Sequence, residues 1–187
     1  YVGSFAASDG AKAAIPVIDA VPAWRWYPSS PDLSYASSAG SMVGCFGPGC
    51  DYDFTSLASR QPWDVLLGTL PTFTTIGNNA ITAQAWLSPL TPAEQYRPVS
   101  PTRNYDFPFT NAWHNSQCSY ANFVPGGNDI DATIVQLFVA HNRMHDWSYM
   151  LGFTERNSNL QLSNFGLTDL TRENDPELGD AQAGAVT

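Results

Sequence analysis

The sequence predicts an α+β fold, in which a loop-rich β lobe precedes one long buried helix. Two patterns lead to this prediction. Apolar residues recur at helical spacing from Ile130 to Leu151, whereas residues 1–125 hold only short apolar runs broken by glycine and proline. Hydrophobic residues make up 43% of the 187 positions, enough to build a core. We therefore expect a β lobe over 1–125 and, over 126–187, the long helix with a following strand and loop segment.

Short strands are expected in the β lobe where apolar residues alternate or cluster between turn signals. The run 73–76 is strand-like and ends at the turn Gly77-Asn78-Asn79, after which 81–87 resumes a strand. From Ser88 to Asn111 five prolines block long regular structure. Further candidate strands are 17–27, 63–67 and, at a sheet edge, 105–107.

The long helix is predicted to cover about 129–151. The side chain of Asn128 or Asp129 can cap its first turn by accepting a bond from an unpaired amide, and Gly152 supplies a left-handed stop. Apolar residues populate most of its faces, which is typical of a central helix covered on several sides. After it, 153–166 is expected to form a strand pair or a turn, and 168–180 an exposed acidic loop.

The charge balance excludes several functional classes. Charged residues make up 13% of the chain, and 17 acids against 8 bases give a net charge of −9. Such a chain is poorly suited to nucleic acid or to an anionic membrane surface, and no stretch approaches the ~18 apolar residues of a membrane span. A single lysine and many glycine, proline and tryptophan residues indicate a secreted, extracellular chain. Because the sequence opens at Tyr1 without an initiator methionine, we expect a processed product or a fragment.

Three cysteines allow more than one pairing. Cys45 and Cys50 flank a glycine- and proline-rich loop that can bring the two sulfur atoms together, so a disulfide between them is favoured in an oxidising compartment. A metal site is less favoured, because two thiolates do not complete a tetrahedral shell. Cys118 is left with a partner outside the chain, a free thiol or a different pairing.

Two histidines in the helix invite a metal interpretation. His141 and His145 are four residues apart and share a helix face. A metallopeptidase helix places a glutamate after the first histidine as general base, and here that position is Asn142, which cannot take up a proton. Core histidines are therefore favoured, and His145 with Asp146 is interpreted as a structural polar pair.

Other polar or aromatic motifs each allow a functional and a structural interpretation. The acidic run 175–180 offers oxygen ligands for calcium, although a solvated acidic loop is favoured. Asn78 and Asn79 are interpreted as turn residues that tolerate positive φ, and the six tryptophans as core rather than a sugar platform. No Gly-x-Ser-x-Gly nucleophile turn is present. We therefore assign no catalytic residue and no metal ligand to this chain.

Several short motifs follow one another in a fixed order along the chain. The helix carries the pairs Leu137-Phe138 and His145-Asp146, and Gly152-Phe153-Thr154-Glu155 follows it. The other landmarks are Pro62-Trp63-Asp64, Gly77-Asn78-Asn79, Tyr96-Arg97-Pro98, Asn159-Leu160-Gln161, Asn164-Phe165-Gly166 and Asp180-Ala181-Gln182. Taken in order, these motifs resemble the fungalysin family of secreted zinc metallopeptidases, in a bacterial branch, and the last of them resembles a run leading towards the family's cleft.

The resemblance implies the N-terminal part of a thermolysin-like catalytic domain, so that 1–187 is one incomplete domain. Family members bind zinc through a His-Glu-x-x-His helix and a downstream glutamate, none of which lies in this chain. We therefore expect a part of a zinc metalloendopeptidase that is inactive alone, binds no zinc itself, and associates with the remainder of its catalytic domain to cleave protein or peptide substrates. The alternatives are a non-catalytic secreted binding module derived from such an enzyme, or a peptidase nicked into two associated chains.

Overall fold

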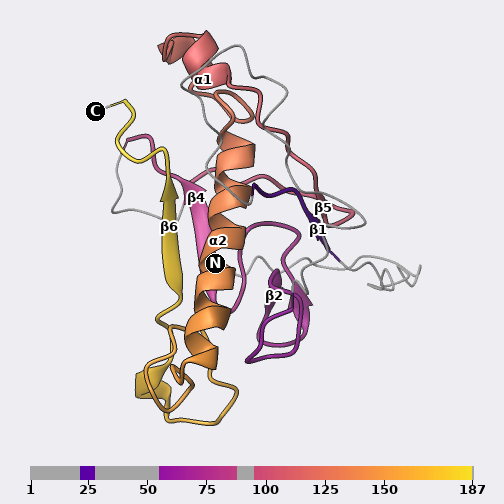
Figure 1. Cartoon of the computed structure of the whole chain (residues 1–187), viewed down its shortest axis with the longest axis vertical. Helices are drawn as coiled ribbons and strands as arrows, with labels where there is room; N and C mark the ends of the chain where they lie inside the picture. Colours follow the sequence, from indigo (N-terminus) through magenta and orange to yellow (C-terminus); the bar gives the residue numbers. More distant parts are fainter. Residues whose placement is uncertain (1–21, 28–54, 88–94, 187) are drawn as a thin grey trace, which may run out of the picture.

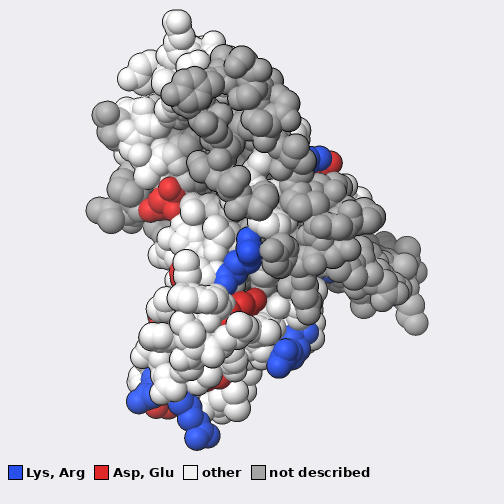
Figure 2. All heavy atoms as spheres, in the orientation of Figure 1, with Lys and Arg blue, Asp and Glu red and all other residues white. Residues whose placement is uncertain are grey.

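A computed structural model describes residues 22–27, 55–87 and 95–186 of the chain. Cys45 and Cys50, the candidate disulfide, lie outside the described residues. The fold is mixed α/β, with one long helix among small sheets, as the sequence predicts (Figure 1). None of the helices in the described part combines the length and the hydropathy of a membrane span. Figure 2 shows Arg, Asp and Glu side chains scattered in small groups over one face, without a continuous basic surface in its described part.

The helix α2, Ile130–Met150, runs through the middle of the described molecule (Figure 1). Its bounds confirm the helix predicted over about 129–151, and Gly152 has the left-handed φ of 103° expected of the stop. The predicted side-chain cap is wrong. Asp129 stands at the N-cap position, but its carboxylate accepts bonds from the backbone amides of Thr110 and Ala112, both at a neighbouring segment, instead of from the first helical turn.

The main strand pair consists of β4, Ala80–Gln84, and β6, Glu177–Ala181, which lie side by side along α2 (Figure 1). They pair in parallel, with Ala80 opposite Glu177 and Gln84 opposite Ala181. The expectation of an exposed loop over 168–180 is therefore wrong at its end. Glu177–Ala181 forms a strand because its backbone pairs with β4, and Gly179 is buried against the helix.

The remaining elements are short. The strand β1, Ala23–Trp24, pairs in parallel with β5, Asn104–Tyr105, and β2, Val65–Leu66, pairs antiparallel with β3, Leu70–Pro71. The predicted strand 73–76 is reduced to isolated bridges at Thr74 and Ile76, and 153–166 contains turns without a strand pair. The short helices are α1 (Ala112–Asn115), η3 (Tyr120–Asn122) and η4 (Leu170–Arg172).

Aromatic side chains fill the core beneath α2. The larger cluster joins β1, β5 and α2, and within it the Trp24 and Tyr105 rings stack with centroids 3.9 Å apart. A smaller cluster around Trp86 and Ile134 lies at the N-terminal half of the helix. Tryptophans buried in the core are Trp24, Trp26, Trp63 and Trp86. These four positions agree with the interpretation of tryptophan as core, while Trp147 is exposed.

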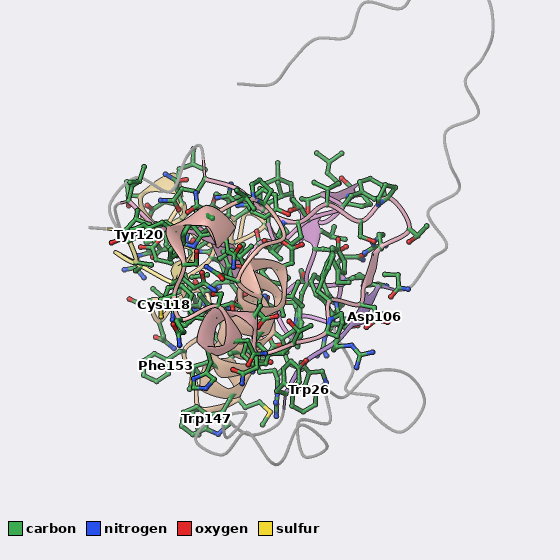
Figure 3. The ribbon with its side chains drawn as sticks, turned by 90° about the horizontal axis from the view of Figure 1, so that it is seen from above. Trp26, Asp106, Cys118, Tyr120, Trp147 and Phe153 are labelled. Carbon is green, nitrogen blue, oxygen red and sulfur yellow. The ribbon has the colours of Figure 1, made fainter. Side chains whose placement is uncertain are left out.

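One side of α2 is not covered by the described residues. Met144, Trp147 and Met150 lie about one turn apart along the helix and are 55%, 56% and 70% exposed. Figure 3 shows Trp147 at the outer edge of the described part of the molecule. Over the described part of the chain, the helix is therefore covered on its sheet side and exposes an apolar stripe on the other. The expectation of cover on several sides is not met there.

Candidate functional site

The pair His145 and Asp146 lies at the centre of a polar network on α2. His145 is buried, with Nδ1 3.2 Å from Oδ1 of Asp146 and Nε2 3.2 Å from Nε2 of Gln161. An amide nitrogen can only donate, so Nε2 of the histidine accepts and its Nδ1–H donates to the carboxylate. The carboxylate also accepts from the backbone amide of Leu57 and from Nε1 of Trp63, both at 3.1 Å. The pair thus connects α2 to two distant loops.

His141 has a different partner from His145. Its Nδ1 bonds Oε2 of Glu177 on β6, which joins the helix to the strand pair. In the acidic run, Asp175 accepts from the backbone amide of Gln161 at 3.1 Å. The described residues contain no group of three or more His, Cys, Asp or Glu side chains that could hold a metal ion. Their donor set therefore does not fit zinc, and the calcium hypothesis stays a prediction.

The turn at Asn78 and Asn79 connects distant segments. The Asn78 side-chain amide exchanges two bonds with the backbone of Ser163, each of 3.0 Å. Asn79 donates from Nδ2 to Oγ of Ser56 at 3.2 Å. Both asparagines are buried, and neither has a positive φ, so the proposed reason for asparagine at this turn is wrong. Their side chains are needed as hydrogen-bonding groups in the interior.

A second buried ionic group was not found from the sequence. Arg103 donates from Nε to Oδ2 of Asp64 at 2.8 Å and from Nη2 to Oδ1, while the hydroxyl of Tyr105 donates to Oδ2 at 2.9 Å. The hydrogen bond to Asp64 raises the pKa of Arg103, and burial raises the pKa of Tyr105. The group joins β5 to the Trp63-Asp64 segment. No local spacing pairs Asp64 with a residue 39 positions away, although Asp64 stands in a recognised motif.

A pocket of about 700 Å³ opens between α1, the turn after it, and the segment that follows β6. Its apolar walls include Phe109, Trp113, Ala183 and Ala185, and Asn128 and Gln182 contribute polar groups. The sequence offered one sign of it, because Asp180-Ala181-Gln182 resembles the run towards the family's cleft. The contribution of 109–118 was not foreseen, since this proline-flanked stretch shows no periodicity.

A family profile and individual related proteins were both found for this sequence. A sequence profile of the family described as Fungalysin metallopeptidase (M36) matches residues 51–187. The Probable extracellular metalloproteinase 5 of Trichophyton verrucosum (strain HKI 0517) is 35% identical over 114 residues, which cover 61% of this chain and 16% of that protein. Extracellular metalloproteinase NpIII of Aspergillus oryzae (strain ATCC 42149 / RIB 40) is 33% identical over 137 residues, covering 67% and 19%. Extracellular metalloproteinase 5 of Arthroderma otae (strain ATCC MYA-4605 / CBS 113480) is 38% identical over 117 residues, covering 61% and 16%.

All three relatives carry the name metalloproteinase, which defines the class of protein that this chain is similar to. The chain belongs to the fungalysin family of metallopeptidases, because the profile of that family matches most of its length. This confirms the resemblance drawn from the ordered motifs. The chain spans less than a fifth of the length of these relatives. Family membership implies zinc in the complete enzyme, whereas the residues described above do not fit that metal.

Proposed function

We propose that this chain is the N-terminal part of a secreted zinc metalloendopeptidase that is inactive without the remainder of its catalytic domain. The profile match over residues 51–187, together with coverage of only 16% of a relative's length, carries the proposal. The hydrogen bonds of His141 to Glu177 and of His145 to Gln161 support a structural role for both histidines. The names of the relatives support an extracellular location.

Within that enzyme, this chain supplies a scaffold. His145 and Asp146 act as a structural pair that holds the loops at Leu57, Trp63 and Gln161 against α2. Hydrogen bonds to a charged acceptor contribute about 1.5–3 kcal/mol each, so the carboxylate is a substantial anchor. The zinc, its ligands and the reacting groups belong to the remainder of the domain, and the substrates are proteins or peptides.

The test compares two expression products. Purified chain 1–187 and the complete reading frame of its source gene are assayed for bound zinc and for casein digestion, with and without a chelator. We expect chelator-sensitive digestion from the complete frame and neither zinc nor digestion from the chain. His141→Ala in the complete enzyme is the matched control and should leave the bound zinc unchanged, because His141 bonds Glu177.

Chelator-sensitive casein digestion by chain 1–187 alone would contradict the proposal. The alternative, a non-catalytic secreted binding module, predicts that the complete reading frame also digests nothing and contains no His-Glu-x-x-His. A nicked two-chain peptidase predicts a native mass well above the 20.3 kDa of this chain, and a lower mass under denaturing conditions.

A further inference from the structure

A second pocket, of about 490 Å³, lies between α2 and the segment that follows β1. Trp26 and Tyr27 form its wall on the β1 side, and Figure 3 shows Trp26 and Trp147 along the same edge of the described part of the molecule. A volume of this size lies within the range of small-molecule sites. The lining residues of the helix recur at the spacing of one helix face, and they include Gln136, Ala140, Arg143, Met144 and Trp147.

Hydrogen bonds and packing hold the wall on the β1 side in place. The backbone amide of Tyr27 donates to Oε1 of Gln136 at 2.7 Å, and Nε2 of Gln136 donates to the backbone carbonyl of Tyr27 at 3.1 Å. The Tyr27 ring makes an edge contact with Phe109, and Trp26 belongs to the larger core cluster. Both sides of the pocket are therefore positioned before any ligand enters, which lowers the entropy cost of binding.

Arg143 determines the charge that this pocket selects. Among the described residues that line it, Arg143 is the one with a charged side chain. Its guanidinium carbon lies 4.6 Å from the centroid of the Trp26 ring, a cation–π distance. Stacking uses the flat face of the guanidinium, whereas its five N–H donors lie in the plane and match the two oxygen atoms of a carboxylate. The stacked arginine is also restrained in advance, so less entropy is lost when a carboxylate binds.

The rest of the lining is mostly apolar. Val139 and Ala140 lie beside the arginine on the helix, and Met144 and Trp147 extend the apolar surface by another turn. Met144 and Trp147 are 55% and 56% exposed, so a ligand body that covers them would remove apolar surface from water. A small inorganic anion would leave that surface exposed, and a neutral apolar molecule would make no ionic bond. A ligand with both an apolar body and a carboxylate uses the whole pocket.

We propose that this pocket binds a carboxylic acid with an aromatic or aliphatic body. Its carboxylate accepts from the guanidinium of Arg143, and its body packs against Met144 and Trp147. Such a ligand has two sources, which are a free organic acid and the C-terminus of a peptide that ends in an apolar residue. The site shares no lining residue with the pocket beside α1, and the proposal does not depend on the peptidase function.

The test titrates chain 1–187 with 4-phenylbutyrate and with its neutral counterpart, 4-phenylbutyramide. We expect saturable shifts of the Arg143 Nε–H and Trp147 indole signals in nitrogen-resolved NMR spectra with the acid, and about tenfold weaker binding of the amide, because the amide lacks the ionic bond. Equal affinity for the acid and the amide, or no saturable shift with the acid, would overturn the proposal.

A second ligand identifies the source of the carboxylate. N-acetyl-phenylalanine presents the C-terminus of a peptide. Tighter binding of N-acetyl-phenylalanine than of 4-phenylbutyrate would support the proposal with a peptide C-terminus as the ligand. The reverse order would support it with a free organic acid.

Two matched pairs of variants localise the binding. Arg143→Gln should weaken binding of 4-phenylbutyrate about tenfold and leave the affinity for the amide unchanged. Arg156→Gln removes the same charge at an exposed position outside the pocket and should change neither affinity. Ala140→Leu adds bulk at an exposed position of the lining and should weaken both ligands, whereas Ala121→Leu makes the same change at an exposed position of η3 and should weaken neither.

Circular dichroism verifies that each variant is folded, and the Ala140 pair keeps the location of the site testable if Arg143→Gln does not fold. Unchanged affinity for 4-phenylbutyrate in folded Arg143→Gln, or in Ala140→Leu, would place the binding elsewhere and refute the proposal.

Discussion

At the scale of single residues, two buried carboxylates of this chain are stabilised by the groups that donate hydrogen bonds to them. The carboxylate of Asp64 receives the guanidinium of Arg103 and a tyrosine hydroxyl, and that of Asp146 receives a tryptophan and a backbone amide. Breaking a buried ionic group by removing one partner leaves an uncompensated charge, at a cost of about 3–5 kcal/mol. These groups therefore fix the relative positions of the segments that they join.

Asp131 is a half-buried carboxyl with one unpaired oxygen, and its substitution makes the pH dependence of stability testable. Burial raises the pKa of Asp131, its hydrogen bond with Tyr96 lowers it, and its Oδ1 has no partner among the described residues. The stabilising contribution of the neutral carboxyl is complete below the unfolded pKa of about 4 and is lost as the pH rises through the higher folded value. Asp131→Asn should therefore match the wild type at pH 3 and exceed its free energy of unfolding at pH 7 by about 1 kcal/mol. The gain is small because the N-terminus of α2 favours a carboxylate by about 0.3–1 kcal/mol.

Urea unfolding between pH 3 and pH 7 measures this difference. Asp169→Asn is the control of opposite sign, because the bond from Thr171 lowers the pKa of the exposed Asp169 carboxyl and favours its charged form. The carboxylate of Asp169 stabilises the fold above the unfolded pKa, and this contribution is lost as the pH falls through the lower folded value. A gap between wild type and Asp131→Asn that does not change with pH would contradict the assignment.

At the scale of elements, close contact of the backbone explains glycine where the turn residues alone do not. A Cβ built on Gly77 would lie 1.8 Å from the carbonyl oxygen of Trp63, so this turn packs directly on the 63–66 segment. Gly77→Ala should lower the free energy of unfolding by about 3 kcal/mol or more, since backbone has to move. Gly166→Ala is the matched control, because Gly166 has a positive φ of 76° but open space around it, and about 1 kcal/mol of strain is expected.

Chemical denaturation of the two alanine variants measures how much each substitution lowers the free energy of unfolding. Equal losses would show that the turn relaxes freely and that the contact between Gly77 and Trp63 does not restrain it. Comparing the two variants separates the cost of steric overlap at Gly77 from the cost of a positive φ at Gly166. A single glycine substitution cannot make that distinction.

Some elements could be predicted from the sequence and others could not. The bounds of α2 were predictable because helical periodicity and a glycine stop are local signals. The strand β6 was missed because Glu177–Ala181 shows no alternation, and its structure depends on pairing with β4. The sequence offered Asn128 or Asp129 as a side-chain cap. Asp129 stands at the N-cap position, but its carboxylate bonds to 110–112, which the spacing around Asp129 does not reveal. Of the candidate site, the pair His145 and Asp146 was found, while Arg103 and the pocket depend on distant contacts.

At the scale of the whole molecule, the apolar stripe on α2 separates residues that stabilise the fold from residues that do not. Met144 and Trp147 are more than half exposed. Met144→Glu combined with Trp147→Lys should change the free energy of unfolding by less than about 0.5 kcal/mol, as surface substitutions do. The same variant should reduce self-association of chain 1–187, because exposed apolar patches promote it.

Sedimentation at several protein concentrations measures the association, and urea unfolding measures the stability. Val139→Lys, on the buried side of the same helix, is the control and should unfold the chain. A loss of more than 1 kcal/mol in the double variant would show that other residues of the chain cover the stripe.

The parallel pairing of β4 with β6 also constrains how this chain is made. The two strands are about a hundred residues apart in sequence, and α2 lies between them. A ribosome releases β4 and then the complete helix well before Glu177 emerges, so a nascent chain carries the apolar sheet side of α2 without the strand pair that covers it. Closing so long a loop is entropically costly and slow. During synthesis, the buried face of the helix is therefore exposed to chaperones and to aggregation until Glu177–Ala181 has emerged and paired with β4.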